Sequence, residues 1–580
     1  MRMQIYLFKF SFIQFIFLVS SEQTDIKYHD FVSTTASQGI SVGEVTPEAG
    51  IFWGIPFSQP PVGKYRWRKP RPPLNFSGDY WNATYARPGC PQTCVFKKNK
   101  YRCVLKTSEN CLHLNVFVPR KILTKSTTKG VVGHHHYVIK EDVKNNKSKA
   151  LAVMVFVHGG NYVHDSASQV IYDSRYLAHR GDVIVVSFDY RLGPLGFLVQ
   201  GEGKDAALGN YGLWDAIKAF EWVKKNIQYF GGNPDMITAF GQSSGAESLS
   251  ILLTTSHGND LFHRAILESD PLSLPFKNMT NAKDFGNRFA RKIGCTAGDL
   301  KCLRGVDVEK IVSSSSESAF SIFSKQSILQ QGQQWGPVID KDLLYEYPIN
   351  AFEKGRFRKI PMIIGGNSAD GYQYAELLFS GFKISQFMYQ LSMDVIFKSN
   401  ANSMLKQYPP NCCDNTKQLT EIITDYVFLC PERSAMFRTE KDSWFYIYGG
   451  TLPFKSLWAF KGCVNLACHG ADIGSVFNPA PLTNYHQSKK EYYLARRVEY
   501  YWTNFAKYGN PNGAPKKHGQ QQDVTNDVEK LSIVQWDRFH DTNIRDYNTI
   551  EFSNNGDKMR KNVLKKKCDF WDNLNLYGKL

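Results

Sequence analysis

One stretch of the chain, Met236 to Leu249, constrains the fold more than any other. An apolar run, Met236 to Phe240, is followed by the turn Gly241-Gln242-Ser243-Ser244-Gly245 and then by a segment with helical character. A short strand, a tight turn around one serine and a helix form the context of a nucleophile elbow, in which a strained turn exposes the serine hydroxyl. Ser243 is therefore the candidate nucleophile.

The pattern Gly-x-Ser-x-Gly is weak evidence by itself, because a chain of this length matches it by chance about once in five sequences. A second match, Gly39-Ile40-Ser41-Val42-Gly43, precedes a strand but has no apolar strand before it and no helix after it. The surrounding sequence therefore favours Ser243 over Ser41.

Apolar runs and helical segments alternate through the middle of the chain, as parallel α/β sheets require. Six runs are typical of buried parallel strands: Leu151 to Val157, Val183 to Phe188, Met236 to Phe240, Arg264 to Leu267, Pro361 to Ile364 and Trp444 to Tyr448. Between two of them, apolar residues from Leu213 to Phe230 recur at helical spacing. We predict an α/β fold with a doubly wound, mostly parallel sheet flanked by helices.

A serine hydroxyl becomes a useful nucleophile when an imidazole removes its proton and a carboxylate holds that imidazole in one tautomer. In this kind of fold, the acid and then the histidine follow the serine in the chain. Asp370 follows the apolar run that begins at Pro361, and His469 lies in a loop beyond the run that begins at Trp444. The order and context of these residues predict Asp370 as the acid and His469 as the base.

The negative charge that develops on a substrate oxygen needs fixed hydrogen-bond donors. The run Leu151 to Val157 ends in His158-Gly159-Gly160-Asn161-Tyr162, where a flexible backbone can turn its amides inward. The amide of Ser244 lies beside the nucleophile in sequence. We expect His158 to support this loop rather than to take part in chemistry.

The first 21 residues have the features of a secretory signal peptide. Arg2 and Lys9 precede an apolar run, Phe10 to Val19, that ends in small residues. A membrane span needs about 20 apolar residues, so an uncleaved anchor is the less favoured alternative. We expect cleavage near Ser21 and a secreted or lumenal protein.

Residues 22–580 are expected to form one large domain, since no stretch has the composition of a flexible linker. No later run is long and apolar enough to span a membrane. The formal net charge is +17, partly from the basic runs 558–561 and 565–567. Such runs usually form a solvated helix face, and binding to an acidic surface is the alternative. No basic and aromatic motif indicates nucleic-acid binding.

Twelve cysteines in an exported chain indicate disulfides. Spacing suggests Cys94 with Cys103 inside a loop closed by Cys90 and Cys111, then Cys295 with Cys302 and Cys463 with Cys468. Cys412, Cys413, Cys430 and Cys568 remain. Zinc at Cys463, Cys468 and His469 is disfavoured, because no fourth ligand follows at metal spacing.

Four Asn-x-Ser/Thr motifs are candidate glycosylation sites on surface loops: Asn75, Asn82, Asn146 and Asn278. Residues 120–150 are rich in Lys, Thr and Asn and are expected to form an exposed insertion. Its three histidines, residues 134–136, could bind a metal, but a solvated loop is the favoured interpretation.

Further blocks of sequence occur in a fixed order along the chain: Phe52 to Phe57, Pro60 to Gly63, Ser108 to Asn115, Asp189 to Gly193, Leu195 to Phe197, Gly209 to Asp215, Phe230 to Pro234, Tyr501 to Ala506 and Cys568 to Trp571. Together with the elbow, they resemble the type-B carboxylesterase and cholinesterase-like family of α/β-hydrolases. The resemblance covers nearly the whole mature chain.

The resemblance implies an α/β-hydrolase fold with Ser243, Asp370 and His469 as the catalytic triad. It implies that the backbone amides of Gly160, Asn161 and Ser244 form the oxyanion hole. It also implies the disulfides Cys90–Cys111, Cys295–Cys302 and Cys430–Cys568, leaving Cys412 and Cys413 without an assigned role.

Three positions depart from the family pattern. Asn161 stands where a third glycine or an alanine is usual, and asparagine tolerates a positive φ better than most residues. Gln242 replaces the usual glutamate and removes a negative charge, while Asp370 replaces a commoner glutamate. The missing charge, and the presence of Tyr101 but no tryptophan ahead of Cys111, argue against a choline ester as substrate.

We therefore expect a serine esterase that hydrolyses small carboxylic esters through an acyl-enzyme on Ser243, with no metal or cofactor. One alternative is a catalytically inactive, cholinesterase-like adhesion or binding protein, since members of the family have lost the triad. Another is a lipase acting on long-chain esters. The complete triad favours the enzyme, whereas the natural ester, the chain-length preference and the oligomeric state stay open.

Overall fold

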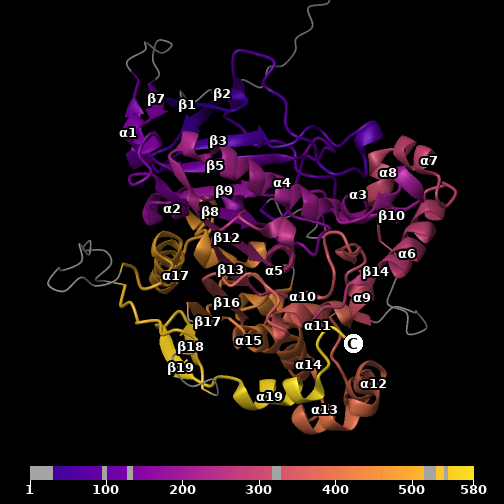
Figure 1. Ribbon diagram of the computed structural model, residues 1–580. Helices are drawn as coiled ribbons and strands as arrows, with labels where there is room; N and C mark the ends of the chain where they lie inside the picture. Colours follow the sequence, from indigo (N-terminus) through magenta and orange to yellow (C-terminus); the bar gives the residue numbers. More distant parts are fainter. Residues whose placement is uncertain are drawn as a thin grey trace, which may run out of the picture.

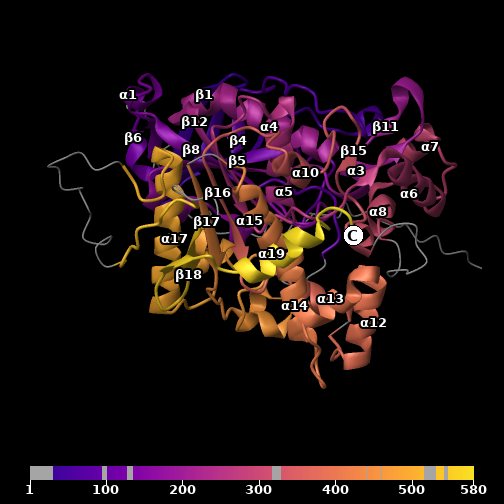
Figure 2. The same cartoon turned by 60° about the horizontal axis from the view of Figure 1, so that its bottom comes forward.

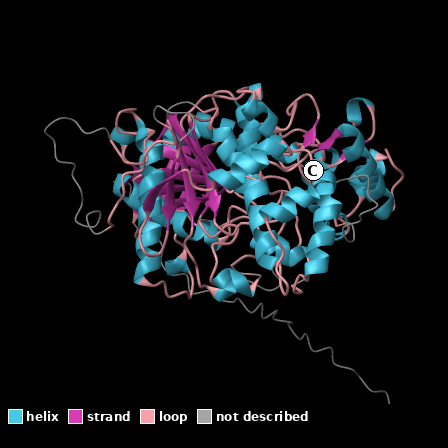
Figure 3. Ribbon diagram, turned by 90° about the horizontal axis from the view of Figure 1, so that it is seen from below, coloured by secondary structure: helices cyan, strands magenta, loops and turns pink. Residues whose placement is uncertain are grey.

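The computed structural model describes residues 30–94, 101–126, 135–316, 328–379, 381–439, 442–458, 460–514, 531–540 and 546–580. The expected signal peptide, residues 1–21, and His134 lie outside the described residues. A large twisted sheet runs through the described part, with helices on both of its faces (Figure 1). Figure 3 shows the strands gathered between two layers of helices.

Fifteen of the described strands form this sheet, in the order β19-β18-β17-β16-β13-β12-β8-β9-β5-β3-β2-β1-β7-β6, with β4 beside β2. The strands are β1 (Asp30–Ala36), β2 (Gly39–Val45), β3 (Ala49–Pro56), β4 (Trp81–Ala83), β5 (His113–Pro119), β6 (Leu123–Lys125), β7 (His136–Ile139), β8 (Leu151–Val157), β9 (Ile184–Phe188), β12 (Gly232–Gln242), β13 (Arg264–Glu268), β16 (Met362–Asn367), β17 (Ser443–Tyr448), β18 (Asn548–Phe552) and β19 (Lys558–Lys561). Two short pairs lie apart from it: β10 (Val199–Gln200) with β11 (Ala207–Leu208), and β14 (Lys277–Asn278) with β15 (Val338–Ile339).

The described helices surround the sheet. They are α1 (Glu141–Lys144), α2 (Arg175–Gly181), α3 (Gly193–Phe197), α4 (Tyr211–Asn226), α5 (Ser244–Thr254), α6 (Met279–Lys292), α7 (Leu300–Gly305), α8 (Val308–Ser313), α9 (Ile328–Gly332), α10 (Pro348–Glu353), α11 (Tyr372–Leu378), α12 (Gln386–Phe397), α13 (Ala401–Gln407), α14 (Thr416–Ile423), α15 (Cys430–Met436), α16 (Ile473–Val476), α17 (Lys489–Tyr508) and α19 (Lys565–Leu574). A π-helical turn, η8 (Thr424–Leu429), joins α14 to α15.

The centre of the sheet is parallel, as predicted. Strands β9, β8, β12, β13, β16, β17 and β18 run in one direction. Each of the six apolar runs singled out in the sequence forms one of these strands, and the helical spacing before β12 forms α4. Strands buried on both faces need apolar side chains at every position, which is why continuous runs identify them.

The side chains of β8 show how the two faces are packed. Val153, Val155 and Val157 join a core with α4 and α5, whereas Met154 and Phe156 join a second core with Trp502 of α17. This division follows from the two-residue period of a strand. Both faces of the sheet are therefore covered by helices, which leaves its strand ends as the place for a site.

The described parts of residues 120–150, namely 120–126 and 135–150, are only partly the exposed insertion that the sequence suggests: most of 140–149 is exposed, whereas the preceding segments join the sheet. They add β6 and β7 to one edge of the sheet, where β7 pairs with β1. Ile122, Tyr137, Ile139 and Val143 are buried there. The elements are only three or four residues long, too short for their alternating pattern to stand out among lysines and threonines.

The structure also shows where the second Gly-x-Ser-x-Gly motif and the two basic runs near the end of the chain lie. The motif around Ser41 lies inside β2, with Ser41 buried, so it forms no turn. The basic run 558–561 is the edge strand β19 rather than a helix face, whereas 565–567 begins α19. An edge strand rich in lysine resists pairing with other chains.

In the described part of the chain, no helix is long and apolar enough to cross a membrane.

Candidate active site

The sharp turn at Ser243 joins the end of β12 to the start of α5. Ser243 has φ 57° and ψ −129°, a strained conformation for a residue with a side chain. The flanking glycines make the turn possible: a Cβ on Gly245 would lie 2.0 Å from the carbonyl oxygen of Val157, and one on Gly241 would lie 2.8 Å from the backbone of Gly245. Ser243 is 7% exposed and faces a cavity.

This turn lies at the switch point of the sheet. From β8 the chain adds β9 on one side and then returns to place β12 on the other. In open α/β sheets, ligands bind beyond the carboxyl ends of the strands at such a point. The loop that follows β8 and the turn that follows β12 therefore meet there.

Asp370 lies just beyond the end of β16 and is fully buried. Its Oδ2 accepts hydrogen bonds from the backbone amide of Asn367 at 2.7 Å and from the hydroxyl of Ser269 at 3.0 Å. Its Oδ1 lies 2.9 Å from Nδ1 of His469. These contacts fix the carboxylate in one orientation toward the imidazole.

His469 is brought to the site by a loop that returns to the sheet. Ala369 and Cys468 form a parallel β-bridge, so Asp370 and His469 are the residues that follow it on each side. Cys468 is joined to Cys463, which closes the loop. The imidazole packs against the rings of Phe428, at 5.0 Å, and Tyr374, at 5.5 Å, measured between centroids.

The other ring nitrogen of His469 faces Gln242. Gln242 Nε2 lies 3.1 Å from His469 Nε2. The hydroxyl of Ser243 interacts with that of Tyr374 instead. Burial raises the pKa of Tyr374, and the contact with Ser243 opposes that rise. The structure thus brings Ser243, Asp370 and His469 into one site, but the serine and the histidine each contact another side chain.

The loop after β8 has the geometry that an oxyanion hole needs. Gly160, Asn161 and Tyr162 have φ values of 98°, 53° and 59°. A Cβ on Gly159 would lie 3.1 Å from the Cβ of Ser243, so the loop runs against the nucleophile. In the described part of the chain, the amides of Gly160, Asn161 and Ser244 donate to no backbone carbonyl. They are available to a ligand.

The side chains of Asn161 and His158 support this loop. Asn161 donates from Nδ2 to the carbonyl of Gly332 at 3.0 Å, which ties the loop to α9. His158 stacks on Tyr190 with ring centroids 4.4 Å apart. Burial lowers the pKa of His158 to about 4, so its imidazole is neutral at pH 7. This agrees with a supporting role for His158.

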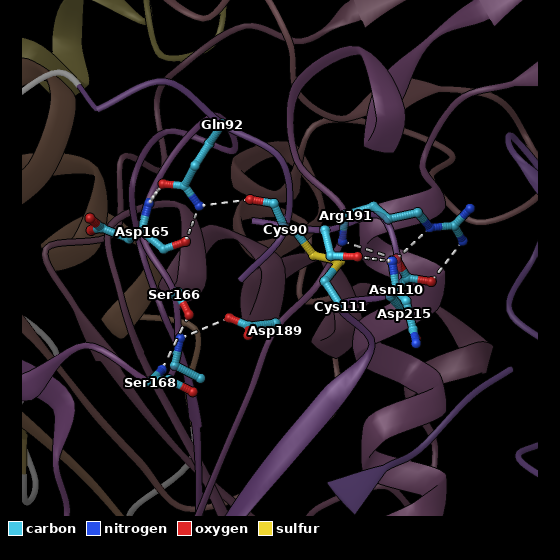
Figure 4. Close-up of a disulfide and its surroundings, with 12 residues drawn as sticks. Cys90, Gln92, Asn110, Cys111, Asp165, Ser166, Ser168, Asp189, Arg191 and Asp215 are labelled. Atoms are coloured by element: carbon cyan, nitrogen blue, oxygen red, sulfur yellow. Dashed lines mark hydrogen bonds and ion pairs between the residues drawn. A yellow bond between two sulfur atoms is a disulfide. The ribbon is translucent and has the colours of Figure 1, made fainter. Parts of the chain in front are cut away.

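A disulfide anchors the same loop from the other side. Cys90 and Cys111 form a pair, and Gln92 bridges it to Asp165 (Figure 4). Gln92 accepts a hydrogen bond from the amide of Asp165 at 2.8 Å and donates to the carbonyls of Asp165 and Cys90. The residues that follow the loop after β8 are therefore held by hydrogen bonds to a segment that the disulfide anchors.

A cavity of about 350 Å³ opens in front of Ser243. This volume lies at the small end of the usual range for ligand pockets, roughly 300–1,000 Å³. None of its lining side chains is acidic or basic, and most are aliphatic or aromatic. They come from the loop after β8, the turn at Ser243, α5, the loop after β13, α9 and the residue after it, α11, α12, α14, η8 and the C-terminal residue: Asn161, Ser243, Ser244, Pro271, Leu274, Leu329, Gly332, Gln333, Tyr374, Leu377, Leu378, Ile396, Phe397, Leu419, Ile422, Ile423, Tyr426, Val427, Phe428 and Leu580.

Sequence reasoning did not identify Tyr374 or the hydrophobic lining from α12, α14 and η8. Tyr374 lies in the first turn of α11, four residues after Asp370, but nothing in the sequence marks it. Tyr101, considered as an aromatic residue for a cation, packs against Phe454 in the core instead. Tyr101 therefore does not place an aromatic ring in the cavity.

Several carboxyl groups are buried behind the triad. Burial, with the nearby charge of Asp370, raises the pKa of Asp472 to about 6, and burial raises that of Asp270 to about 7. Asp472 accepts hydrogen bonds from Tyr446 at 2.9 Å and Asn367 at 3.2 Å. Burial also raises the pKa of Glu268, which accepts a bond from Trp502 at 2.6 Å. These groups order the residues that carry Asp370.

Five pairs of cysteines lie at disulfide distance, and they are the pairs expected from spacing and resemblance. The pairs are Cys90–Cys111, Cys94–Cys103, Cys295–Cys302, Cys430–Cys568 and Cys463–Cys468. Cys412 and Cys413 are exposed, with their sulfur atoms 2.7 Å apart. Among the described residues, no three His, Cys, Asp or Glu side chains could hold a metal ion together. His136 lies 2.8 Å from the hydroxyl of Ser33.

The four asparagines of the glycosylation motifs are all exposed. In two of the motifs the hydroxyl group of the third residue donates a hydrogen bond to the asparagine side chain: Thr84 to Asn82 at 2.7 Å, and Ser148 to Asn146 at 2.8 Å. Asn278 instead caps α6 by accepting from the amide of Asn281. Asn75, Asn82, Asn146 and Asn278 stay candidate sites.

Comparison with known proteins places this geometry among related chains. The family model described as "Carboxylesterase family" matches residues 32–571. The "Crystal protein" of Dictyostelium discoideum is 33% identical over 488 residues, which cover 83% of this chain and 83% of that protein. The mouse "Cholinesterase" is 30% identical over 520 residues, covering 83% of this chain and 80% of that protein.

Two further comparisons extend this result. The mouse "Neuroligin-3" is 30% identical over 510 residues, covering 81% of this chain and 60% of that protein. A solved structure of a "PNB esterase" superposes with a TM-score of 0.71 and 25% identity, covering 93% of this chain and 99% of that one. The similarity therefore extends over nearly the whole described fold.

Proposed function

The chain belongs to the carboxylesterase family, and from this premise we propose that it is a serine esterase that hydrolyses carboxylic esters through an acyl-enzyme on Ser243. The observation that carries the proposal is the convergence of Ser243, His469 and the free loop amides at one end of an apolar cavity. Membership of the family and the fold support a hydrolase, while the residue roles are our proposal.

The proposed acylation step follows from the contacts of the three side chains. Asp370 accepts a hydrogen bond from Nδ1–H of His469, so Nε2 carries the lone pair. Ser243 Oγ attacks the ester carbonyl carbon as its proton passes to Nε2. The carbonyl oxygen becomes an oxyanion, which the amides of Gly160, Asn161 and Ser244 stabilise.

Collapse of the tetrahedral intermediate breaks the ester bond. His469 returns the proton to the departing alcohol oxygen, which leaves Ser243 acylated. Water then attacks the acyl carbon as His469 takes one of its protons. The bond between Ser243 Oγ and the acyl carbon breaks, His469 returns the proton to Oγ, and the carboxylic acid departs. For the first step, the side chain of Gln242 must leave Nε2 of His469, and Ser243 must leave Tyr374.

A binding protein without catalysis is the second candidate. Relatives with names as different as cholinesterase and neuroligin-3 share this fold, so family membership alone does not establish catalysis. The contact of Gln242 with His469 favours this candidate, because it occupies the nitrogen that the reaction needs. The free amides and the apolar cavity support the esterase.

We also propose export through a signal peptide at residues 1–21 and a single domain spanning residues 22–580. The five cysteine pairs support an oxidising compartment. The single sheet that includes strands from β1 to β19 supports one domain. We propose in addition that the four exposed asparagines of the glycosylation motifs carry sugar chains.

The test combines hydrolysis of p-nitrophenyl esters with labelling by an organophosphate and mass mapping of the adduct. We expect turnover and a label on Ser243. Ser243→Ala should lower turnover by about 10⁶-fold, the scale on which loss of such a nucleophile acts. Ser41→Ala is the matched control, because Ser41 has the same flanking pattern and should keep both turnover and label. Folded protein with neither turnover nor label would favour the binding protein.

A further inference from the structure

Helix α12 exposes an unusual number of large apolar side chains. Phe387 is 72% exposed, Leu391 50%, Met388 37% and Val395 36%. Residues three and four apart lie on one side of a helix, so these four side chains form one stripe. We name this stripe the α12 apolar face.

The opposite side of the same helix is apolar as well. Tyr389, Met393 and Phe397 are buried against the body of the protein. A surface helix normally turns its large apolar side chains toward the core and its polar side chains toward solvent. Figure 2 shows α12 at the margin of the molecule, beside α13 and away from the sheet. The α12 apolar face is thus a surface whose composition suits contact with something apolar.

Helix α12 also forms part of the wall of the candidate active-site cavity. Ile396 and Phe397, at its end, line the cavity in front of Ser243. Leu377 of the neighbouring helix α11 lines the same cavity and is itself exposed. The apolar lining therefore continues from the interior to the surface through the helices that carry the exposed side chains.

Exposed lysines lie at both ends of α12. Lys383 precedes the helix, Lys398 follows it and Lys406 lies on α13. Asp394 is the one acidic residue between positions 381 and 406, and Asp414, beyond that stretch, lies near Lys383. An exposed apolar stripe with lysines at its ends is a feature of helices that lie in the surface of an anionic lipid layer.

We propose that the α12 apolar face docks onto an anionic lipid surface, and that the esters hydrolysed are long-chain esters drawn from that surface into the cavity. The second half of this inference rests on the proposed function. The first half does not, because docking needs no chemistry at Ser243.

The test of docking is flotation of the Ser243→Ala protein with vesicles of phosphatidylcholine and phosphatidylserine. This variant removes the proposed nucleophile, so hydrolysis does not alter the lipid. Adding Phe387→Ser and Leu391→Ser should weaken vesicle binding at least about tenfold, since each side chain contributes through its buried apolar area. Leu105→Ser with Leu208→Ser is the matched control, because both leucines are exposed elsewhere, and it should leave binding unchanged.

Circular dichroism and thermal melting establish that each variant is folded. Unchanged vesicle binding in the folded α12 variant overturns the docking site. A loss of dimers in light scattering, without any change in vesicle binding, would assign the face to contact between two copies and equally overturn it. Equal binding to vesicles of phosphatidylcholine alone would remove the role of the lysines and of anionic lipid.

The substrate half is tested with the protein that carries Ser243. We expect turnover of long-chain esters presented in the same vesicles, and a fall of at least about tenfold when the α12 apolar face is changed. Turnover of short soluble esters but not of the vesicle-bound esters would overturn the substrate class alone. Vesicle binding without turnover of any ester would overturn the proposed function and leave docking intact.

Discussion

Gln242 Nε2 lies 3.1 Å from His469 Nε2, on the side of the imidazole that faces away from Asp370. With Nδ1 paired to Asp370, the amide of Gln242 donates to the lone pair that would accept the proton of Ser243 in the proposed mechanism. This arrangement therefore holds His469 in the tautomer that the mechanism needs while Gln242 covers the nitrogen that would react. Gln242 is the residue whose replacement reports most directly on this arrangement.

Replacement of Gln242 by glutamate should shift the pH dependence of activity. A carboxylate beside the imidazole favours its charged form, so His469 would stay protonated to higher pH. In Gln242→Glu the midpoint of the kcat/KM profile should move upward by about one pH unit relative to the wild type. Gln242→Met is the control without charge and should leave the midpoint in place.

The pH–rate profile distinguishes two explanations. If the midpoint of Gln242→Glu does not move, the side chain does not contact His469 during turnover. If wild-type activity is flat down to pH 4, His469 is not the base.

The parts of this molecule that the sequence predicts are those in which local pattern and burial coincide. Strands β8 and β12 are apolar at nearly every position because they are covered on both faces, and the glycines around Ser243 have no room for a side chain. Asp370 and His469 are found because each follows a strand. The order of the chain is then sufficient to pair them.

The parts that the sequence does not predict depend on contacts between distant segments. Tyr374 and Val427 face the cavity only because α11 and η8 lie together in space, beside His469. Strands β6 and β7 have apolar residues at too few positions to form a visible pattern. The contact between Gln242 and His469 spans 227 positions in the sequence. No local pattern encodes such a distance.

The side chain at position 161 should be tolerated as glycine but not as valine. Asn161 has φ 53°, a conformation that costs an ordinary residue roughly 1–2 kcal/mol. Glycine removes that cost while losing the bond to Gly332, so Asn161→Gly should keep turnover within about a few fold. A β-branched residue is strained most at a positive φ, so Asn161→Val should displace an oxyanion donor and lower kcat toward the loss of about 10²-fold to 10³-fold seen when one donor is removed.

Steady-state kinetics with one short ester separates these outcomes, and KM should change less than kcat. Equal turnover of Asn161→Val and the wild type would show that the amide of residue 161 does not bind the oxyanion. A loss in Asn161→Gly as large as in Asn161→Val would assign the role to the side chain instead.

Asp270 should stabilise the protein more near pH 5 than near pH 7.5. Burial raises the pKa of Asp270 to about 7, from an unfolded value of about 3.9. Between these values the folded state binds a proton that the unfolded state releases, so the contribution of Asp270 to the free energy of unfolding falls as pH rises through this window. Asp189, whose pKa burial also raises to about 7, acts in the same direction. His158, whose pKa burial lowers to about 4, acts in the opposite direction.

Urea unfolding of the wild type and of Asp270→Asn at the two pH values isolates this contribution. On going from pH 7.5 to pH 5, the free energy of unfolding should change by about 1–3 kcal/mol more in favour of folding in the wild type than in Asp270→Asn, since one pKa unit corresponds to 1.36 kcal/mol. Asp79→Asn, at an exposed position, should behave like the wild type. An Asp270→Asn protein whose stability depends on pH as that of the wild type does would contradict this account.

Filling the cavity should select against long acyl chains. Val427 of η8 lines the cavity and is buried, so Val427→Phe places extra carbon atoms where a long acyl chain would lie. An acyl chain that cannot enter loses about 0.8 kcal/mol for each methylene left in water. We expect kcat/KM for p-nitrophenyl decanoate to fall at least about tenfold, while that for the acetate changes less than about twofold.

Val395→Phe adds the same atoms on the solvent side of α12 and should alter neither value. Equal losses for both esters in Val427→Phe would mean that this cavity does not hold the acyl chain, and the alcohol would then be the group that occupies it.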